Sequence, residues 1–513
     1  MSNEFDDLER RLGSATGDLR TQINSTEIPD FKPRRDGLRV VAVAAAVIVF
    51  AFFGWSILND QPNSLDTVDT PDSEDGSPAP DTPDGDDDSS DNDAIEEGVD
   101  EGVEDDVEPN QQDAPVSDPN DVPSPSADEL IVGFDTTPPV DAREPGALGE
   151  VRPDPAYGSS VRRIVDATPD QPAAVGSAFV SPENADGTLA LIMRNDESWD
   201  VVDRATLEST LLANVDRRSE PHWDPTDPNR LRHFPEETAD RRLQLLASTV
   251  DGSTETLVDL TDRVREVFPN AAFFETGFGH DPAGGSVYDW AVGDDQGNIV
   301  GFVSYDLEQN VILGSAPIGP DGIGEFSSVR ISPSGTHVIV GYDENSVLLD
   351  VELTMPRVLD QRDRGGALVS MPNAGDALIT VDLQSDPPTG GWIYWTDLES
   401  GEINLLFELF GGANTSVSFS ASDGQPGWAV MSSFTCRDLG AWSCDKVTAV
   451  HLASGTLVNL AHTYLCAPAS TAVPAASLSP SFERIYFNSD SGSCGDPIEV
   501  RELTVPPDVF DLG

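Results

Sequence analysis

The amino-acid sequence predicts an all-β fold, a β-propeller of about seven blades that one transmembrane helix holds outside a membrane. Three observations support this prediction. Similar stretches return every 40 to 50 residues or so in the C-terminal part, as expected of four-stranded blades. One apolar run lies near the N-terminus, and a strongly acidic segment follows it. The predicted parts are a cytoplasmic segment, residues 1–37, a transmembrane helix, 38–58, a disordered acidic linker, 59–150, and the propeller, 151–508.

Residues 1–37 form a short segment before the predicted membrane helix. Apolar residues recur at steps of three and four, which is typical of one helix face, at Phe5, Leu8, Leu12, Ala15 and Leu19. Gly13 and Gly17 weaken such a helix. Two interpretations remain open: a docking helix for a cytosolic partner, or a marginal helix that lies near the bilayer or in solvent.

The run "VVAVAAAVIVFAFFGWSIL", residues 40–58, is uncharged and long enough to cross a hydrocarbon core of about 30 Å. Only acidic residues follow it closely, whereas basic residues precede it, namely Lys32, Arg34, Arg35 and Arg39. The positive-inside rule therefore places the N-terminus in the cytoplasm and the rest outside. A cleaved signal peptide is the alternative, but the leader is long and the run exceeds the usual length of about 7 to 15 residues.

Residues 60–128 consist largely of Asp, Glu, Pro, Ser, Asn and Gly, and no Lys or Arg lies between Arg39 and Arg143. Such a segment buries too little apolar surface to offset the entropy of ordering, so we expect disorder. The chain has 92 acidic and 29 basic residues, which argues against nucleic acid as a partner because phosphate binding needs a basic face. Adaptation to high salt and cation binding both remain explanations of the acid excess.

From Tyr157 onward, short β-rich runs alternate with turns rich in Gly, Pro, Asp and Asn, and only residues 204–213 suggest a helical turn. A lone four-stranded unit would leave both faces in water, so the units must pack around a ring. Seven units are visible, beginning near "SAFVSPENADGTLALI", "EPHWDPTDPNRLRHF", "AAFFETGFGHDPAGGSVYDWAV", "SSVRISPSGTHVIV", "GGALVSMPNAGDALITV", "TSVSFSASDGQPGWAVMSS" and "AASLSPSFERIYFNSD".

The fourth unit, "VRISPSGTHVIVGYDENSVLLDVE", shows the expected plan of a blade. One strand ends at residues 329–331, and residues 332–335 form a turn in which Gly335 adopts a conformation that costs other residues energy. Residues 338–340 form a second strand whose continuous apolar run suits burial on both faces. Residues 348–351 form a third strand.

The "SPSG" turn and the closing turns "DLESGE" (397–402) and "HLASGT" (451–456) resemble those of WD40-like propellers of the TolB type. The stretches "PHWDPTDPNRL" and "SASDGQPGWAVMSS", and the final "LSPSFERIYFNSDSG", are similar to the propeller of oligogalacturonate lyases and their uncharacterised relatives, over roughly residues 176–507. Those lyases use several histidines, some as metal ligands, at blade openings. Here the fifth and sixth units open without His, so the resemblance implies the scaffold without the metal site.

The sequence shows no catalytic or metal-binding pattern. It has no H-E-x-x-H, C-x-x-C or G-x-S-x-G motif and no phosphate-binding glycine loop, and its carboxylates are too many to single out a glycosidase pair. We expect no metal and no cofactor, with calcium as the alternative that loops such as "DGDDDSS" leave open.

Three residues are candidates for ligand binding. His222 lies beside Trp223 in the "WDPTDP" turn, and His280 lies in a Gly-rich loop; a packing role is the alternative for both. Trp442, in "CRDLGAWSC", is expected in an exposed loop, whereas the tryptophans inside the repeats are expected in the core.

All four cysteines follow the predicted membrane helix, on the side where disulfides persist. Of the three possible pairings we prefer Cys436 with Cys444 and Cys466 with Cys494, because each closes a local hairpin or blade.

The sequence thus favours a non-catalytic binding or scaffolding module for an envelope protein or glycan. A transmembrane sensor that signals through residues 1–37 is one alternative. A polysaccharide lyase or hydrolase of the oligogalacturonate lyase type is another.

Overall fold

A computed structural model describes most of the chain from Pro125 onward. The described residues are 125–126, 129–137, 146–168, 172–194, 198–216, 219, 221–235, 243–276, 286–319, 322, 324–359, 366–373, 375–382, 391–409, 416–434, 442–465, 475–492 and 497–513. The predicted cytoplasmic segment, membrane helix and most of the predicted linker lie outside these residues. Among the residues that are described, no helix has the length and apolar character needed to cross a bilayer.

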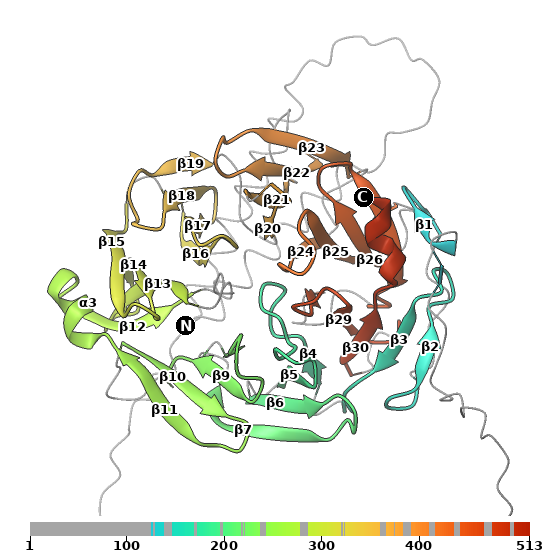
Figure 1. The fold of residues 1–513 in the computed structure, drawn as a ribbon, viewed down its shortest axis with the longest axis horizontal. Coiled ribbons are helices and arrows are strands. Elements are labelled where there is room, and N and C mark those ends of the chain that lie inside the picture. Colours follow the sequence, from blue (N-terminus) through green and yellow to red (C-terminus); the bar gives the residue numbers. More distant parts are fainter. Residues whose placement is uncertain are drawn as a thin grey trace, which may run out of the picture. The chain divides into compact units, whose positions relative to one another are not determined.

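Seven antiparallel sheets stand around a ring, which confirms the predicted seven-bladed β-propeller (Figure 1). Six of them contain four strands that follow one another in the chain, and one of these six has β1 as a fifth strand. Blade 1 contains β4 (Ala173–Ala174), β5 (Leu189–Arg194), β6 (Ser198–Asp203) and β7 (Ser209–Asp216). Blade 2 contains β8 (His222–Trp223), β9 (Arg230–His233), β10 (Gln244–Thr249) and β11 (Thr254–Asp259). Blade 3 contains β12 (Ala271–Glu275), β13 (Val287–Asp294), β14 (Ile299–Asp306) and β15 (Val311–Pro317).

The next three blades repeat this order. Blade 4 contains β16 (Phe326–Ile331), β17 (His337–Tyr342), β18 (Ser346–Asp350) and β19 (Arg357–Leu359). Blade 5 contains β20 (Ala367–Ser370), β21 (Asp376–Asp382), β22 (Trp392–Asp397) and β23 (Ile403–Glu408). Blade 6 contains β24 (Ser416–Ser420), β25 (Trp428–Phe434), β26 (Lys446–His451) and β27 (Thr456–His462).

Blade 7 closes the ring with strands from both ends of the domain. Its C-terminal strands are β28 (Ala476–Leu478), β29 (Arg484–Ser489) and β30 (Glu499–Thr504), and β3 (Ser160–Arg163) pairs with β30. Two short strands extend the outer edges: β2 (Val151–Pro153) pairs with β3, and β1 (Ile131–Val132) pairs with β27 of blade 6. Strand β1 therefore lies within the segment that the sequence predicted as linker.

The strand predictions in blade 4 are confirmed. Strands β16, β17 and β18 match the three predicted strands, except that β18 ends one residue before the predicted end. In the turn between the first two, the Gly335 N–H donates to the Ser332 carbonyl at 2.8 Å. Gly335 has φ 73°, the left-handed conformation for which a glycine was expected.

Alternating residues of one strand pack against different neighbouring blades. In β13, Trp290 belongs to a buried cluster with Leu245 of blade 2, whereas Ala291 belongs to a buried cluster with Val338 and Val340 of blade 4. This follows from the two-residue period of a strand, which sends successive side chains to opposite faces. The hydrophobic core is therefore divided into layers between the blades.

Helix α3 (Thr261–Val267) was not predicted from the sequence. It lies between β11 and β12 at the rim of the ring, where it buries Val264 (Figure 1). In contrast, residues 204–213, where the sequence suggested a helical turn, form a short turn at 204–206 and then the start of β7. The chain ends in a 3-10 helix, η4 (Pro507–Leu512).

Candidate functional site

The structure places two of the three predicted ligand-binding residues, Trp442 and His222, in different blades. Trp442 belongs to the core of blades 5 and 6, His222 belongs to blade 2, and His280 lies outside the described residues. No shared site for the three is therefore visible in the described part of the chain.

Trp442 is buried, so its expected exposed position is wrong. Its side chain is 4% exposed and makes edge contacts with the rings of Phe407 and Phe134. Its indole N–H donates to the Glu408 carbonyl at 3.4 Å. Phe134 comes from the segment after β1, so the N-terminal side of the domain covers a residue that the sequence placed in solvent.

His222 is also buried, at 6% exposure, opposite Arg232 in the β8–β9 pair. Its ring lies 5.9 Å from that of Tyr288 in blade 3. Arg232 bridges the same two blades, because it contacts the Tyr288 hydroxyl and pairs with Asp224 at 2.9 Å. The surroundings of His222 are those of a contact between blades.

Among the described residues, no group of three His, Cys, Asp or Glu side chains is placed to hold a metal ion. Cys444 is not a free thiol and is 6% exposed, while the other three cysteines lie outside the described residues. The preferred disulfide pairing remains a prediction.

A buried charge cluster joins blade 7 to blade 1. Glu183, 2% exposed, accepts hydrogen bonds from Arg484 Nε at 2.7 Å and from the Tyr486 hydroxyl. Glu502 accepts from Arg204 Nε at 2.8 Å and from Arg162 Nε at 2.9 Å. Burial keeps water from the ionised Glu502 carboxylate, which raises its pKa. The guanidinium groups of Arg204 and Arg162 outweigh this effect, so the pKa is below its usual value.

A second buried cluster joins blade 6 to the segments that precede blade 1. Asp154 accepts a hydrogen bond from the His462 backbone N–H at 3.1 Å, and their side chains approach to 3.8 Å. Burial raises the pKa of Asp154, but the neighbouring His462 side chain and backbone N–H lower it by a larger amount, so the net pKa is below its usual value. Nearby, Asp135 accepts from the Tyr157 hydroxyl at 2.8 Å and pairs with Lys446 at 3.3 Å.

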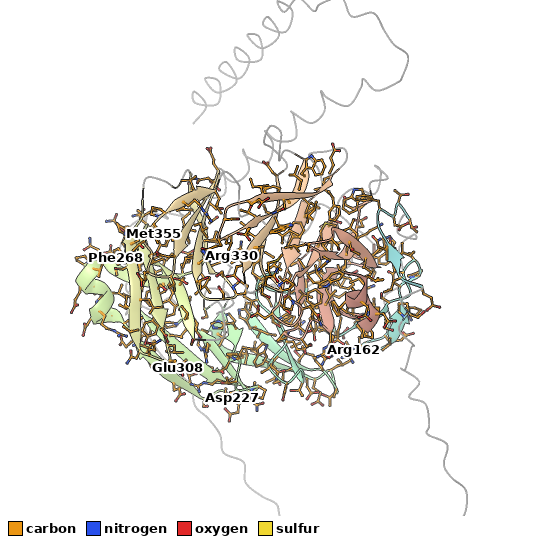
Figure 2. All side chains as sticks on the ribbon, turned by 45° about the horizontal axis from the view of Figure 1, so that its top comes forward. Arg162, Asp227, Phe268, Glu308, Arg330 and Met355 are labelled. Atoms are coloured by element: carbon orange, nitrogen blue, oxygen red, sulfur yellow. The ribbon has the colours of Figure 1, made fainter. Side chains whose placement is uncertain are left out.

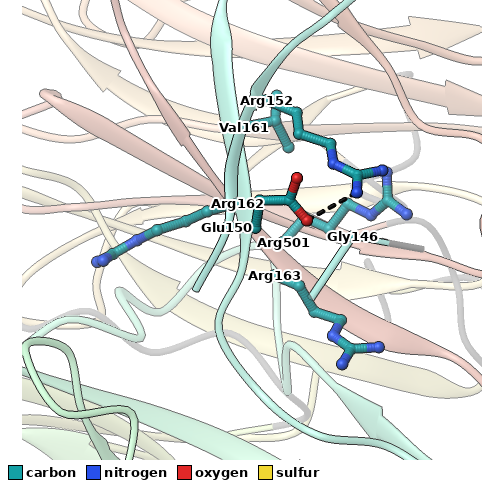
Figure 3. A pocket seen from close by; sticks show the side chains of 7 residues that line it. All are labelled: Gly146, Glu150, Arg152, Val161, Arg162, Arg163 and Arg501. Carbon is teal, nitrogen blue, oxygen red and sulfur yellow. Dashed lines mark hydrogen bonds and ion pairs between the residues drawn. The ribbon is translucent and has the colours of Figure 1, made fainter. Parts of the chain in front are cut away.

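A pocket rich in arginine lies at the outer edge of blade 7, over strands β2, β3 and β30 (Figure 3). Its volume is about 20 Å³. The lining residues are Gly146, Glu150, Val161 and four arginines, Arg152, Arg162, Arg163 and Arg501. A chain with a net charge of −63 thus places several arginines along the walls of one small cavity.

The strand register decides which arginines face the pocket. Arg163 lies directly opposite Arg501 in the β3–β30 pair, so these two share one face of the sheet. Arg162 has the opposite orientation: it points away from Arg152 and Arg163 in Figure 3, toward Glu502. Arg152 lies opposite Val161 on the pocket face.

Two carboxylates compensate part of this positive charge. Glu499, 5% exposed, accepts from Arg501 Nη2 at 2.8 Å and from Arg163 Nη1 at 3.4 Å. Glu150 accepts from Arg152 Nη2 at 2.7 Å and from the Ala147 backbone N–H at 2.9 Å. The arrangement can therefore bind an anionic group.

Sequence reasoning missed this pocket. The dipeptide Arg162–Arg163 was visible, but in a strand only one of two neighbours faces a given side. Arg501 comes from the opposite end of the domain, and its pairing with β3 depends on how the ring closes. A pattern within one stretch of sequence does not contain that information.

The fold resembles that of known proteins, at low sequence identity. No family model and no curated protein matches the chain. An oligogalacturonate lyase from Vibrio parahaemolyticus has a similar structure, with TM-score 0.50 and 11% identity over 70% of this chain and 97% of that one. An oligogalacturonate lyase in complex with manganese gives TM-score 0.49 and 13% identity over 70% and 96%. At 11% identity the likeness to the Vibrio protein shows the fold alone, and that fold is the predicted propeller.

Proposed function

We propose that this protein is a membrane-anchored extracytoplasmic β-propeller that acts as a non-catalytic binding or scaffolding module for an envelope protein or glycan. Residues 38–58 anchor it as a single transmembrane helix with the N-terminus in the cytoplasm. The acidic linker then separates the propeller from the bilayer, whose anionic head groups repel it.

The observation that supports the non-catalytic role is that buried acidic side chains form ion pairs with arginines. The buried carboxylates of Glu183, Asp224 and Glu502 each pair with an arginine, and all three pairs lie within or between blades. Groups bound in this way stabilise the ring and are not available to transfer protons to a substrate. This supports binding through the surface of a rigid scaffold.

The proposal is tested by photo-crosslinking in cells, followed by mass spectrometry of what co-purifies. The crosslinking residue is introduced at Met355 or Leu211, which are 77% and 63% exposed. A second form lacks residues 2–31 but keeps Lys32 to Arg39, so that the same charges orient the helix. We expect an envelope protein or glycan to be recovered equally from both forms.

Two results would favour the alternatives. Recovery of a cytosolic regulator from the full-length chain only would support a transmembrane sensor. Turnover of polyuronate after addition of a divalent metal would support a lyase.

A further inference from the structure

We propose that the arginine pocket of blade 7 binds one carboxylate group of an acidic peptide segment in a partner protein, and that Arg163 is the anchoring residue. This inference rests on the proposed binding function and specifies a contact site and a ligand chemistry for it.

The charges on the pocket face favour an anion. Three guanidinium groups, those of Arg152, Arg163 and Arg501, face two carboxylates, those of Glu150 and Glu499. A third carboxylate, Asp166, reaches Arg163 only at 3.4 Å and is 73% exposed, so solvent screens it. The pocket therefore has one buried positive charge in excess, which a monoanion would balance.

Arg163 has the donors that such an anion needs. Its Nε is buried and has no hydrogen-bond partner among the described residues. Its Nη1 and Nη2 reach Glu499 and Asp166 at 3.4 Å each, which is longer than the usual range of about 2.7 to 3.2 Å. By contrast, Arg501 makes bonds of 2.7 to 3.1 Å to Ser491 and Glu499. A guanidinium presents Nε and one Nη side by side, in the spacing that matches two carboxylate oxygens.

The size of the pocket selects the kind of ligand. A cavity of about 20 Å³ has room for one or two water-sized groups, since one water needs about 10 to 15 Å³. Two carboxylate oxygens on a narrow methylene stem fit this space. A uronic acid fits less well, because its carboxylate is attached directly to a wide sugar ring.

In the wall of the pocket, an arginine already binds a glutamate side chain of this chain. Glu150 receives one hydrogen bond from Arg152 and one from the Ala147 backbone N–H. Gly146 allows this close packing, since a Cβ there would lie 3.3 Å from Arg152 Nε. A carboxylate from a partner would bind Arg163 by the same chemistry.

The test is a ligand-observed NMR titration of the full-length protein in detergent micelles, at constant ionic strength. The probe is N-acetylglutamate amide, and N-acetylglutamine amide, galacturonate and sulfate are compared with it. We expect the glutamate probe to bind, and Arg163→Gln to weaken this binding about tenfold or more because a charged hydrogen-bond pair is lost. Arg163→Lys keeps the charge but loses the paired donors, so we expect intermediate binding.

Arg230→Gln is the control, because Arg230, like Arg163, is a strand arginine; it pairs with an exposed carboxylate, Glu255, and lies outside the pocket. Thermal unfolding of each variant shows whether it is folded. The proposal would be overturned if the glutamate probe bound wild type and Arg163→Gln equally well. It would also be overturned if wild type bound the glutamine probe as well as the glutamate probe. Tighter binding of galacturonate would replace the peptide by a glycan, and tighter binding of sulfate would make the pocket a general anion site; either would overturn the peptide assignment.

Failure of this inference is distinguishable from failure of the proposed function. If Arg163→Gln leaves the crosslinked partner unchanged, the pocket assignment is wrong while the binding function stands. If the probe binds wild type through Arg163 but no envelope partner is recovered by crosslinking, the pocket assignment stands and the binding function fails.

Discussion

The guanidinium carbon of Arg330 lies 4.6 Å from the ring centroid of Phe179. Arg330 is in β16, the first strand of blade 4, and Phe179 is in the loop between β4 and β5 of blade 1. Figure 1 shows this loop reaching toward the middle of the ring, and Figure 2 shows Arg330 nearer the middle than Met355. The loop of blade 1 thus contacts a blade three positions away.

This contact predicts that Phe179 stabilises the ring as a whole. We expect Phe179→Ala to lower the free energy of unfolding by about 1 to 2 kcal/mol, since the cation–π contact and part of the ring burial are lost. Phe179→Leu keeps apolar volume without a ring face and should lose about half as much. Thermal and urea unfolding measure both, and equal stability of all three proteins would show that the loop contact contributes nothing.

A second prediction compares two glutamates that pair with the same arginine. Glu183 is 2% exposed and pairs with Arg484 across the junction of blades 1 and 7, whereas Glu483 pairs with it at 3.3 Å and is 67% exposed. We expect Glu183→Gln to cost about 3 kcal/mol, because it leaves a partly buried guanidinium without its main partner. Glu483→Gln should cost less than about 1 kcal/mol. Equal losses in urea unfolding would contradict a role of Glu183 in ring closure.

A third prediction concerns pH. Asp289 in β13 is 1% exposed, its oxygens have no hydrogen-bond partner among the described residues, and Ser304 lies opposite it on β14. Burial raises the pKa of this carboxyl from 3.8 to about 8, and Ser304 opposes only a small part of the shift. The folded protein therefore binds the Asp289 proton more tightly than the unfolded chain does. The contribution of Asp289 to stability is present below pH 4 and is lost as the pH rises toward 8.

The measurement is the melting temperature of wild type and Asp289→Asn between pH 4 and pH 9. We expect the variant to become more stable than wild type as the pH rises, since an amide does not ionise. Glu308→Gln, at an exposed site, should keep the wild-type profile. A constant difference between Asp289→Asn and wild type over this range would show that Asp289 does not titrate there.

Much of the ring was predictable from local sequence because its signals are local. The turn at Gly335 and the continuous apolar strand after it lie within one stretch, so both could be read without knowing their neighbours. Helix α3 was missed because it has only seven residues and buries only Val264, which leaves almost no helical period to detect. The partner strand of β3 could not be read because β30 belongs to the other end of the domain.

The burial of Trp442 and His222 was missed for the same reason as the arginine pocket. Neither a buried His222 nor an arginine facing a cavity has a sequence signature, because burial depends on which blade packs beside it. Trp442 was expected in solvent because Phe134, whose ring contacts it, comes from a segment that composition assigned to the linker.

A last prediction separates the core role of Trp442 from the ligand-binding role expected of an exposed tryptophan. Its side chain belongs to the cluster that joins blades 5 and 6, which includes Phe407, Met431 and Val450. We expect Trp442→Ala to lower the free energy of unfolding by about 3 to 5 kcal/mol, since the cavity left behind adds to the lost burial. Trp442→Phe keeps most of the apolar volume and should recover more than half of that loss. A variant that unfolds like wild type but no longer retains the crosslinked partner would instead make Trp442 a binding residue and would contradict the burial seen here.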